Sequence, residues 1–555
     1  MCVRLTGTAL ANQFGHVLDG CVYGLDLLGL RTNMTCNLGL TTNSVSIGYD
    51  GIDQLTNWSG KESGGALRHN EQLAYAYDAA GNLHTRTNDA LIQTFNVDAL
   101  NQISNVTRTG ALTVPGATPV PASVTVNGTN AQTNGDFTFA GGSNTLANGA
   151  NTFTIVAQNP YGFASTNAFT LNLYTNAPFQ YDANGNLTND GTRVFSYDAE
   201  NELTNVFATN AWRVGFVYDG LNRRRITRNY TWSSAWVETN EIHYIYDGML
   251  VLQERDTNNN PQVTYTRGLD LSLSRQGAGG IGGLLARTDA NGSTFYHSDG
   301  IGNITALMDI YQNIVARYRY DAYGKLLGRW GALADANHYR FSSMEYFSNP
   351  GIYGYLRRFY EPNFQRWLNR DPSAEIGGIN LYEAFFNSPL LFVDRNGQDN
   401  IGNMAAGNNA PPSMTISQPT GGGSVSAQFN GGGLGDPLLL MGSAMMSGAP
   451  IAIAITAAIE DPWGAAQVAA MLADAIRHQK QPKCQANSGP DKQPVVGMAK
   501  KPDIKFIDYL QKKFRFSDPT RERIHRYISK QGYTEEEIEE IAREFAEEAG
   551  EYETE

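Results

Sequence analysis

The stretch Tyr181-Asp182-Ala183-Asn184-Gly185-Asn186-Leu187 decides the fold, because versions of it return along most of the sequence. Other copies, some of them divergent, begin at Tyr49, Tyr77, Val97, Tyr197, Tyr218, Tyr246, His297 and Tyr320. Close copies lie roughly 16–28 residues apart, a spacing that is typical of stacked supersecondary units. The sequence therefore predicts a tandem array of short repeated units.

Each unit has the chemistry of a β-hairpin. The alternation in 194–197 (Val-Phe-Ser-Tyr) predicts a strand with one apolar face. Asp182 then opens a turn, because a carboxylate accepts hydrogen bonds from nearby backbone N–H groups. Asn184-Gly185 supplies the positive φ of a tight hairpin, and Leu187 starts the next strand. A single hairpin is marginally stable in water, so the units must pair with their neighbours. The repeated tyrosines and aspartates are therefore predicted to be structural.

Composition supports a many-stranded β protein. Turn-forming glycine (58 residues) and strand-forming tyrosine (28) and phenylalanine (24) are abundant together. The net charge of −13 argues against a surface built mainly to bind nucleic acid. The cysteines are Cys2, Cys21, Cys36 and Cys484. They show no CxxC spacing, so we expect neither a zinc site nor a disulfide framework.

The amino-terminal end of the chain gives little information about export. Residues 1–5 (Met-Cys-Val-Arg-Leu) lack the charged and then apolar pattern of a signal peptide. Residues 23–29 already resemble a divergent repeat, so we expect the chain to open inside a repeat array.

One stretch interrupts the array. Between about Thr113 and Tyr174 the repeat is absent, and residues 124–128 and 151–157 read as half-buried strands between Gly/Asn turns. We interpret residues 111–176 as an immunoglobulin-like β-sandwich inserted in a loop, which serves either as an adhesion module or as a spacer.

Three later motifs are more specific. They are Arg267–Ser274 with the glycine-rich stretch 277–286, then Tyr318–Lys325, and finally Tyr355–Gly397. With these motifs, residues 20–398 outside the insert resemble the RHS (rearrangement hot spot) proteins, the bacterial YD-repeat family that includes toxin-complex C subunits. The resemblance implies a β-shell that encloses a variable C-terminal effector.

Gly277, Gly279 and Gly282 also fit the dinucleotide-binding pattern GxGxxG. That pattern requires a preceding strand, a following helix and a later acidic residue. Strand-like sequence (Leu284-Leu285-Ala286-Arg287) follows here instead. We therefore reject a nucleotide site and assign the segment to the shell.

The third motif carries the candidate chemistry. The resemblance implies that Asp371 and Asp394 form an intramolecular aspartyl protease supported by Arg370, with cleavage near Gln398-Asp399. Two carboxylates held together do not both ionise cheaply, so one keeps a proton while the other activates water. A guanidinium beside them steadies negative charge.

The sequence departs from the family at this motif. Arg395 stands where the family usually has proline, and the amide of Gln398 replaces an apolar residue. The alternative interpretation is that Asp371 and Asp394 only cap turns.

The tail changes in composition after Gly397. Residues 399–502 combine a Gly-rich linker with Ala-rich apolar sequence, and residues 437–459 are uncharged. We favour an amphiphilic or buried helical segment there over a stable membrane anchor. Residues 503–555 are predicted to be helical, with a capping box at residues 534–537. Arg521, Arg523 and His525 are compatible with an acid–base site, and equally with a solvated helix face.

These observations predict a mainly β fold with a helical tail. The predicted segments are 1–110 and 177–345 (YD-repeat shell), 111–176 (insert), 346–398 (core-associated segment), 399–502 (linker) and 503–555 (helical module). We expect no cofactor or metal. One hypothesis is a secreted or cell-surface shell that frees its own tail as a toxin, with a cognate immunity protein as partner and other cells or surfaces as targets. The other is a structural or adhesive surface protein with an inert tail.

Overall fold

The computed structural model describes residues 5–39, 41–376 and 378–398, and the backbone of three short strands beyond them, Asn400–Gly402 (β37), Met414–Ser417 (β38) and Ser426–Phe429 (β39). Asp399, the apolar segment 437–459, the helical module 503–555 and its candidate residues Arg521, Arg523 and His525 lie outside these residues. Within the described part of the chain, no helix is both long enough and apolar enough to cross a membrane.

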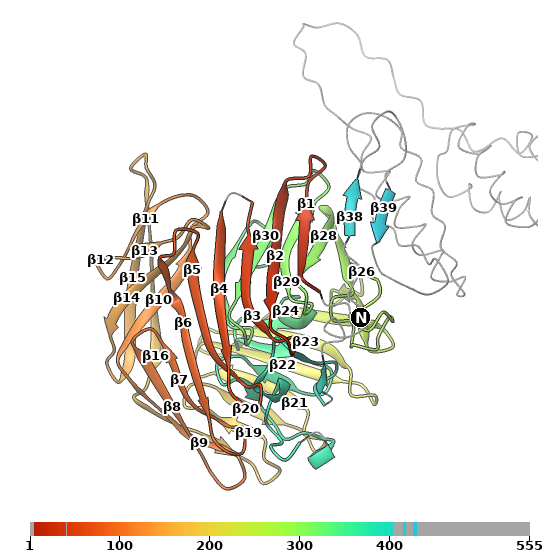
Figure 1. The fold of residues 1–555 in the computed structure, drawn as a ribbon. Helices are drawn as coiled ribbons and strands as arrows, with labels where there is room; N and C mark the ends of the chain where they lie inside the picture. Colours follow the sequence, from red (N-terminus) through yellow and green to blue (C-terminus); the bar gives the residue numbers. More distant parts are fainter. Residues whose placement is uncertain are drawn as a thin grey trace, which may run out of the picture. The chain divides into compact units, whose positions relative to one another are not determined.

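The first sheet is a ten-stranded antiparallel meander in which each strand pairs with its neighbour in the sequence, except that the last pairing joins the strands on either side of the insert (Figure 1). Its strands are Gly7–Ala11 (β1), Val17–Leu25 (β2), Arg31–Asn37 (β3), Thr42–Tyr49 (β4), Leu55–Glu62 (β5), Leu67–Tyr77 (β6), Leu83–Asn88 (β7), Leu91–Val97 (β8), Ile103–Thr109 (β9) and, after the insert, Asn176–Pro178 (β17).

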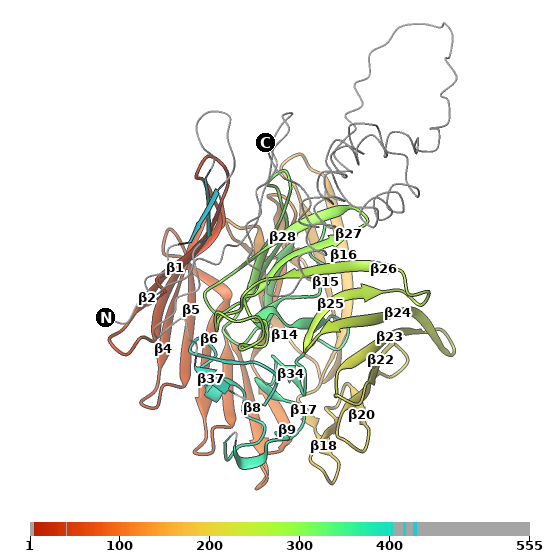
Figure 2. The same ribbon diagram turned by 90° about the vertical axis from the view of Figure 1, so that its right-hand side faces the viewer.

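The second sheet continues the same meander over fourteen strands, and Figure 2 shows β22 to β28 side by side. Its strands are Gln180–Tyr181 (β18), Leu187–Asn189 (β19), Val194–Tyr197 (β20), Leu203–Ala208 (β21), Trp212–Tyr218 (β22), Arg224–Trp232 (β23), Trp236–Asp247 (β24), Leu250–Arg255 (β25), Pro261–Arg267 (β26), Leu284–Asp289 (β27), Gly292–Ser298 (β28), Ile304–Asp309 (β29), Ile314–Tyr320 (β30) and Leu326–Trp330 (β31).

The insert lies between β9 and β17, which pair directly with each other. It has two small sheets, β10-β14-β13 and β12-β11-β15-β16. Their strands are Ala111–Ala117 (β10), Ser123–Val126 (β11), Thr129–Asn130 (β12), Gln132–Thr133 (β13), Thr138–Thr145 (β14), Gly149–Gln158 (β15) and Ala164–Leu173 (β16). Val114, Val124, Val126, Phe139 and Phe153 form a buried cluster separate from the main core.

The turn of each repeat is built on one aspartate. In the unit that begins at Tyr181, Asp182 Oδ1 accepts the N–H groups of Asn184 at 3.0 Å and Asn186 at 2.9 Å. The same i+2 and i+4 contacts recur at Asp50, Asp78, Asp98, Asp198, Asp219, Asp256, Asp299, Asp309 and Asp321. Gly185, at i+3, has a φ of +84°, which is why glycine or asparagine is common at this position.

The repeat tyrosines join successive hairpins. Tyr77 donates its hydroxyl to the carbonyl of Leu55 at 2.8 Å, and Tyr320 donates to the carbonyl of Ile304 at 2.8 Å. Tyr49, Tyr218 and Tyr246 make equivalent bonds. Each phenol thus satisfies a backbone carbonyl at the start of the preceding strand while its ring remains in the apolar layer.

Residues 332–398 pack against both sheets as short elements. They are the 3₁₀ turns Phe341–Ser343 (η1), Ala374–Ile376 (η2) and Phe385–Asn387 (η3), and the strands Glu345–Phe347 (β32), Ile352–Gly354 (β33), Phe359–Glu361 (β34), Arg366–Trp367 (β35) and Phe392–Asp394 (β36). One hydrophobic core contains side chains of the first sheet (Phe95), the second sheet (Val206) and this segment (Tyr360, Trp367, Phe385). Residues 332–398 therefore connect the two sheets.

The beginning of the meander also contacts its end. Asp19 on β2 bonds His297 on β28 at 2.8 Å, and Arg319 on β30 donates to Glu71 on β6 at 2.7 Å. Arg317 reaches the carbonyl of Leu18 at 2.7 Å. Strands that are about 280 residues apart in sequence are thus held together by buried polar contacts.

The expectation for the cysteines was wrong at one pair. Cys21 on β2 and Cys36 on β3 are directly opposite in the strand register, with Cα atoms 4.0 Å apart, and they form a disulfide. CxxC spacing says nothing about cysteines that an antiparallel pairing places opposite each other, so the sequence pattern could not reveal this bond.

The tyrosine bonds predict a selective loss of stability. Tyr320→Phe leaves the buried carbonyl of Ile304 without its donor and should lower the free energy of unfolding by about 1–2 kcal/mol. The matched control is Tyr311→Phe, because the Tyr311 side chain is 71% exposed at a repeat turn. Urea unfolding followed by fluorescence measures both, and equal losses would contradict the structural role of the Tyr320 hydroxyl.

Candidate active site

Asp394 lies at the end of β36 on a turn like those of the repeats. Its Oδ1 accepts the N–H groups of Asn396 at 3.1 Å, Gly397 at 2.7 Å and Gln398 at 3.1 Å, and the residue is fully buried. Gly397 has a φ of +86°, as the i+3 residue of a repeat turn does. The candidate catalytic carboxylate therefore sits on the local framework that serves a structural role elsewhere in the array.

Asp371 follows β35 and turns its two oxygens in different directions. Oδ1 accepts the N–H of Ser373 at 2.8 Å and also bonds the hydroxyl of that residue. Oδ2 accepts the Nη2–H of Arg358 at 2.7 Å. Its side chain is only 8% exposed, so the carboxylate is largely withdrawn from bulk water.

Arg358, just before β34, brings the two carboxylates together. Its Nη2 lies 2.7 Å from Asp371 Oδ2 and 3.7 Å from Asp394 Oδ2. Its Nε donates to the carbonyl of Gly397, and its guanidinium carbon lies 4.3 Å from the centre of the Trp367 ring. One buried cation thus offsets the repulsion between two acids and holds the peptide next to Gln398.

Arg370 occupies a different place. A Cβ on Gly185 would lie 2.8 Å from Cζ of Arg370 and 2.6 Å from the Tyr382 hydroxyl, so the Arg370 side chain covers the Gly185 turn. The guanidinium that the structure places on both carboxylates belongs to Arg358. Arg358 lies within the motif Tyr355–Gly397, but no local pattern marks it as a site residue, since only the tertiary fold brings β34 next to the Asp394 turn.

Gln398, on one side of the predicted cleavage position, lies in the loop of a small hairpin. Strand β36 pairs with β37, and Asp394 is opposite Asn400. The N–H of Gln398 contacts Asp394 Oδ1 at 3.1 Å and Asn396 Oδ1 at 3.0 Å. The chain therefore reverses direction directly beside the two carboxylates.

A small cavity borders this site. It measures about 10 Å³, enough for about one water molecule, and Arg358, Asn369 and Tyr197 are among its lining residues. The Tyr197 hydroxyl is buried and has no hydrogen-bond partner within the described part of the chain. The cavity therefore offers a polar position for water close to Arg358.

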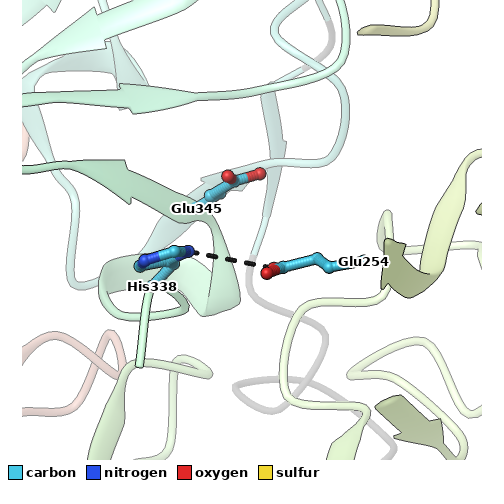
Figure 3. Close-up of side chains that lie close together, drawn as sticks. All are labelled: Glu254, His338 and Glu345. Atoms are coloured by element: carbon cyan, nitrogen blue, oxygen red, sulfur yellow. Dashed lines mark ion pairs between the residues drawn. The ribbon is translucent and has the colours of Figure 1, made fainter. Parts of the chain in front are cut away.

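A second cluster, Glu254, His338 and Glu345, offers three ligand atoms within 4.8 Å of one another (Figure 3). Its groups already have partners. Glu345 pairs with Arg224 and accepts the Tyr244 hydroxyl at 2.8 Å, and His338 Nδ1 lies 3.8 Å from Glu254. Burial lowers the pKa of His338, but the bond to Glu254 outweighs it and raises that pKa. The cluster is therefore better described as a buried ion-pair network than as a cation site.

Glu383 joins the core-associated segment to a repeat turn. Its Oε1 accepts the amide of Asn387 at 2.8 Å and would lie 2.6 Å from a Cβ on Gly81. Burial raises the pKa of Glu383 to about 7, although Arg366 opposes the shift. The fold therefore favours the neutral carboxyl.

Comparison with known proteins finds that parts of this chain are similar to toxin proteins. The chain is 31% identical over 232 residues to the tRNA3(Ser)-specific nuclease WapA of Bacillus spizizenii, a match that covers 39% of this chain and 9% of that protein. It is 30% identical over 111 residues to toxin subunit YenC1 of Yersinia entomophaga, covering 19% of this chain and 10% of the subunit. Over part of its length, the chain is related to RHS-type toxin proteins.

The extent of this relationship is limited. The chain spans about a tenth of the length of these two curated relatives. The crystal structure of TcdB2-TccC3-Cdc42 aligns with 71% of this chain and 21% of that chain, at 17% identity and a TM-score of 0.33. No family model matches the sequence.

The raised pKa of Glu383 predicts a pH-dependent substitution effect. A folded pKa near 7, above the ordinary value of 4.5, contributes stability below about pH 4.5 that is lost as pH rises through 7. Glu383→Gln mimics the neutral acid, so it should stabilise the chain by about 3 kcal/mol at pH 8 and have little effect at pH 4.5. Chemical unfolding at the two pH values measures the difference. The control is Glu375→Gln at an exposed position of η2, and an equal effect of Glu383→Gln at both pH values would contradict the assignment.

Proposed function

We propose that this chain is part of an RHS-type toxin protein whose YD-repeat shell encloses a C-terminal effector and frees it by a self-cleavage that Asp371 and Asp394 catalyse. The observation that carries the proposal is the position of Arg358, which contacts both carboxylates and the Gly397 carbonyl. Two carboxyl groups and one guanidinium, the polar groups of an acid–base site, thus lie at the segment in which the resemblance predicts cleavage.

The reaction is the hydrolysis of one peptide bond. One carboxylate takes a proton from a water molecule as the oxygen of that water attacks the carbonyl carbon of Gln398. The other carboxyl gives its proton to the amide nitrogen of Asp399 as the C–N bond breaks, leaving a carboxyl group and an amine. Arg358 keeps the two acids and the Gly397 carbonyl in one arrangement, which lowers the entropic cost of the step.

The names of the relatives support a toxin-related role. WapA is named a tRNA nuclease and YenC1 a toxin subunit, and both match part of this chain. We assign residues 399–555 to the effector, with the shell as its carrier and a cognate immunity protein as its partner. The disulfide Cys21–Cys36 supports secretion, because such bonds persist mainly in oxidising compartments.

A second candidate function has one observation in its favour. The Asp394 turn repeats the hydrogen bonds of turns such as Asp309, which has N–H contacts at 2.9 and 2.8 Å. The chain would then be a structural or adhesive surface protein, with the 111–176 insert, proposed to be immunoglobulin-like, as a binding module or spacer. Asp371 and Asp394 would only stabilise turns.

Self-cleavage distinguishes the two candidates. The purified chain should separate into two fragments that meet at Gln398-Asp399, and Asp371→Asn or Asp394→Asn should slow the reaction at least about 100-fold by removing an acid–base group. Intact-mass spectrometry over time measures the rate and the position. The matched control, Asp309→Asn, alters a turn with the same N–H contacts and should cleave normally. A stable full-length chain, or equal slowing by the control, would rule out the protease.

The effector role has a separate test. Production of residues 399–555 in a bacterial host should arrest growth, whereas the full chain carrying Asp371→Asn should be tolerated because its tail stays attached to the shell. Colony counts after induction measure both. Normal growth with the free tail at equal protein levels would favour the structural alternative.

A further inference from the structure

The glycine-rich loop between β26 and β27, residues 268–283, is held rigidly from within. Asp270 is 3% exposed, and its Oδ2 accepts the N–H groups of Ala278 at 2.7 Å and Gly280 at 3.1 Å. Its Oδ1 accepts the N–H of Ser272 at 2.9 Å. One buried carboxylate thus fixes both arms of the loop, which the sequence had assigned only to the shell.

Residues outside the loop also restrict its position. Gly282 donates its N–H to Ser343 Oγ at 3.0 Å, and the side chains of Ala278 and Ile281 are buried in the core. A Cβ on Gly302, in the neighbouring repeat turn, would lie 2.8 Å from the nitrogen of Gly282. The loop therefore has little room to move away from a segment that packs against it.

The candidate cleavage segment packs against this loop at Gly279. Gly279 has a φ of +67°, and a Cβ at this position would overlap the carbonyl oxygen of Arg395 and lie 2.7 Å from its carbonyl carbon. Backbone thus lies directly on backbone. Arg395 immediately follows Asp394, so the contact is at the first residue of the turn that presents Gln398.

A second segment also holds the turn. Arg357 donates its N–H to the carbonyl of Asn396 at 2.9 Å, and a Cβ on Gly397 would lie 3.1 Å from the nitrogen of Arg358. The turn is therefore held by contacts with both the Arg357-Arg358 backbone and the glycine-rich loop.

We propose that Gly279 is a positioning residue for self-cleavage, because its lack of a side chain lets the loop seat Arg395 and thereby fix Asp394 and Gln398 against Arg358 and Asp371. This inference rests on the proposed self-cleavage. A Cβ at Gly279 would force Arg395 away from the loop by the order of 1 Å, and misplacement on that scale costs reactions up to about 100-fold in rate.

The test uses the full chain with Gly279→Ala and a matched control in the same loop. Gly280 has a similar φ of +78°, but a Cβ there would meet side-chain atoms, Leu250 Cδ2 at 2.6 Å and Arg267 Nη1 at 3.3 Å. Gly280→Ala therefore carries the same backbone strain without touching Arg395. Melting temperatures of both variants check that the fold is equally preserved.

Two readouts are needed. Gly279→Ala should slow self-cleavage at least about tenfold relative to Gly280→Ala. In an Asp371→Asn background, which prevents self-cleavage, trypsin should gain a cut after Arg395 in native Gly279→Ala but not in Gly280→Ala. Mass spectrometry locates this cut among the other tryptic sites, and a general loss of stability would not produce it selectively.

The outcomes separate the two proposals. Equal cleavage rates in the two glycine variants, or an Arg395 that stays resistant to trypsin in Gly279→Ala, would overturn the positioning role. If the unsubstituted chain does not cleave itself, the proposed function fails. The tryptic cut then decides by itself whether the glycine-rich loop holds the segment.

Discussion

The structure depends on one repeated interaction, an aspartate carboxylate that accepts the N–H groups two and four residues ahead of it. Asp78 does this at 2.9 Å for both Ala80 and Asn82. The contact closes the turn, satisfies donors that a tight hairpin would leave unpaired, and fixes the register of the next strand. Because each hairpin starts where the last one ended, the same interaction propagates a meander through two long sheets.

The candidate active site is a modified use of this turn. Asp394 has the local contacts of a repeat aspartate, yet it faces Arg358 and lies near Asp371. The packing around Asp394 differs from that around the repeat aspartates, because residues 332–398 form short strands that pack against both sheets. A structural turn and a catalytic group are therefore compatible at one residue, since Oδ1 serves the turn while Oδ2 points to the guanidinium.

Buried polar groups explain why this segment has a defined position. Arg358 would be costly to bury alone, but it has carboxylates, carbonyls and the Trp367 ring as partners. The network of Arg224, Glu345 and Tyr244 acts in the same way between β23, β32 and β24. Such paired charges tolerate little displacement, which favours one arrangement of the core-associated segment over many.

The sequence by itself determined the repeat, its turn chemistry and the mainly β fold, because these are local patterns of a few residues, whereas the two aspartates worth testing came from the resemblance to the RHS family. It did not reveal the Cys21–Cys36 bond, which depends on strand register, nor that Arg358 contacts both carboxylates while Arg370 covers Gly185. The role of Gly279 was equally hidden, since Arg395 is more than a hundred residues away along the chain. Contacts between distant segments follow from how strands stack, and only the tertiary structure decides that.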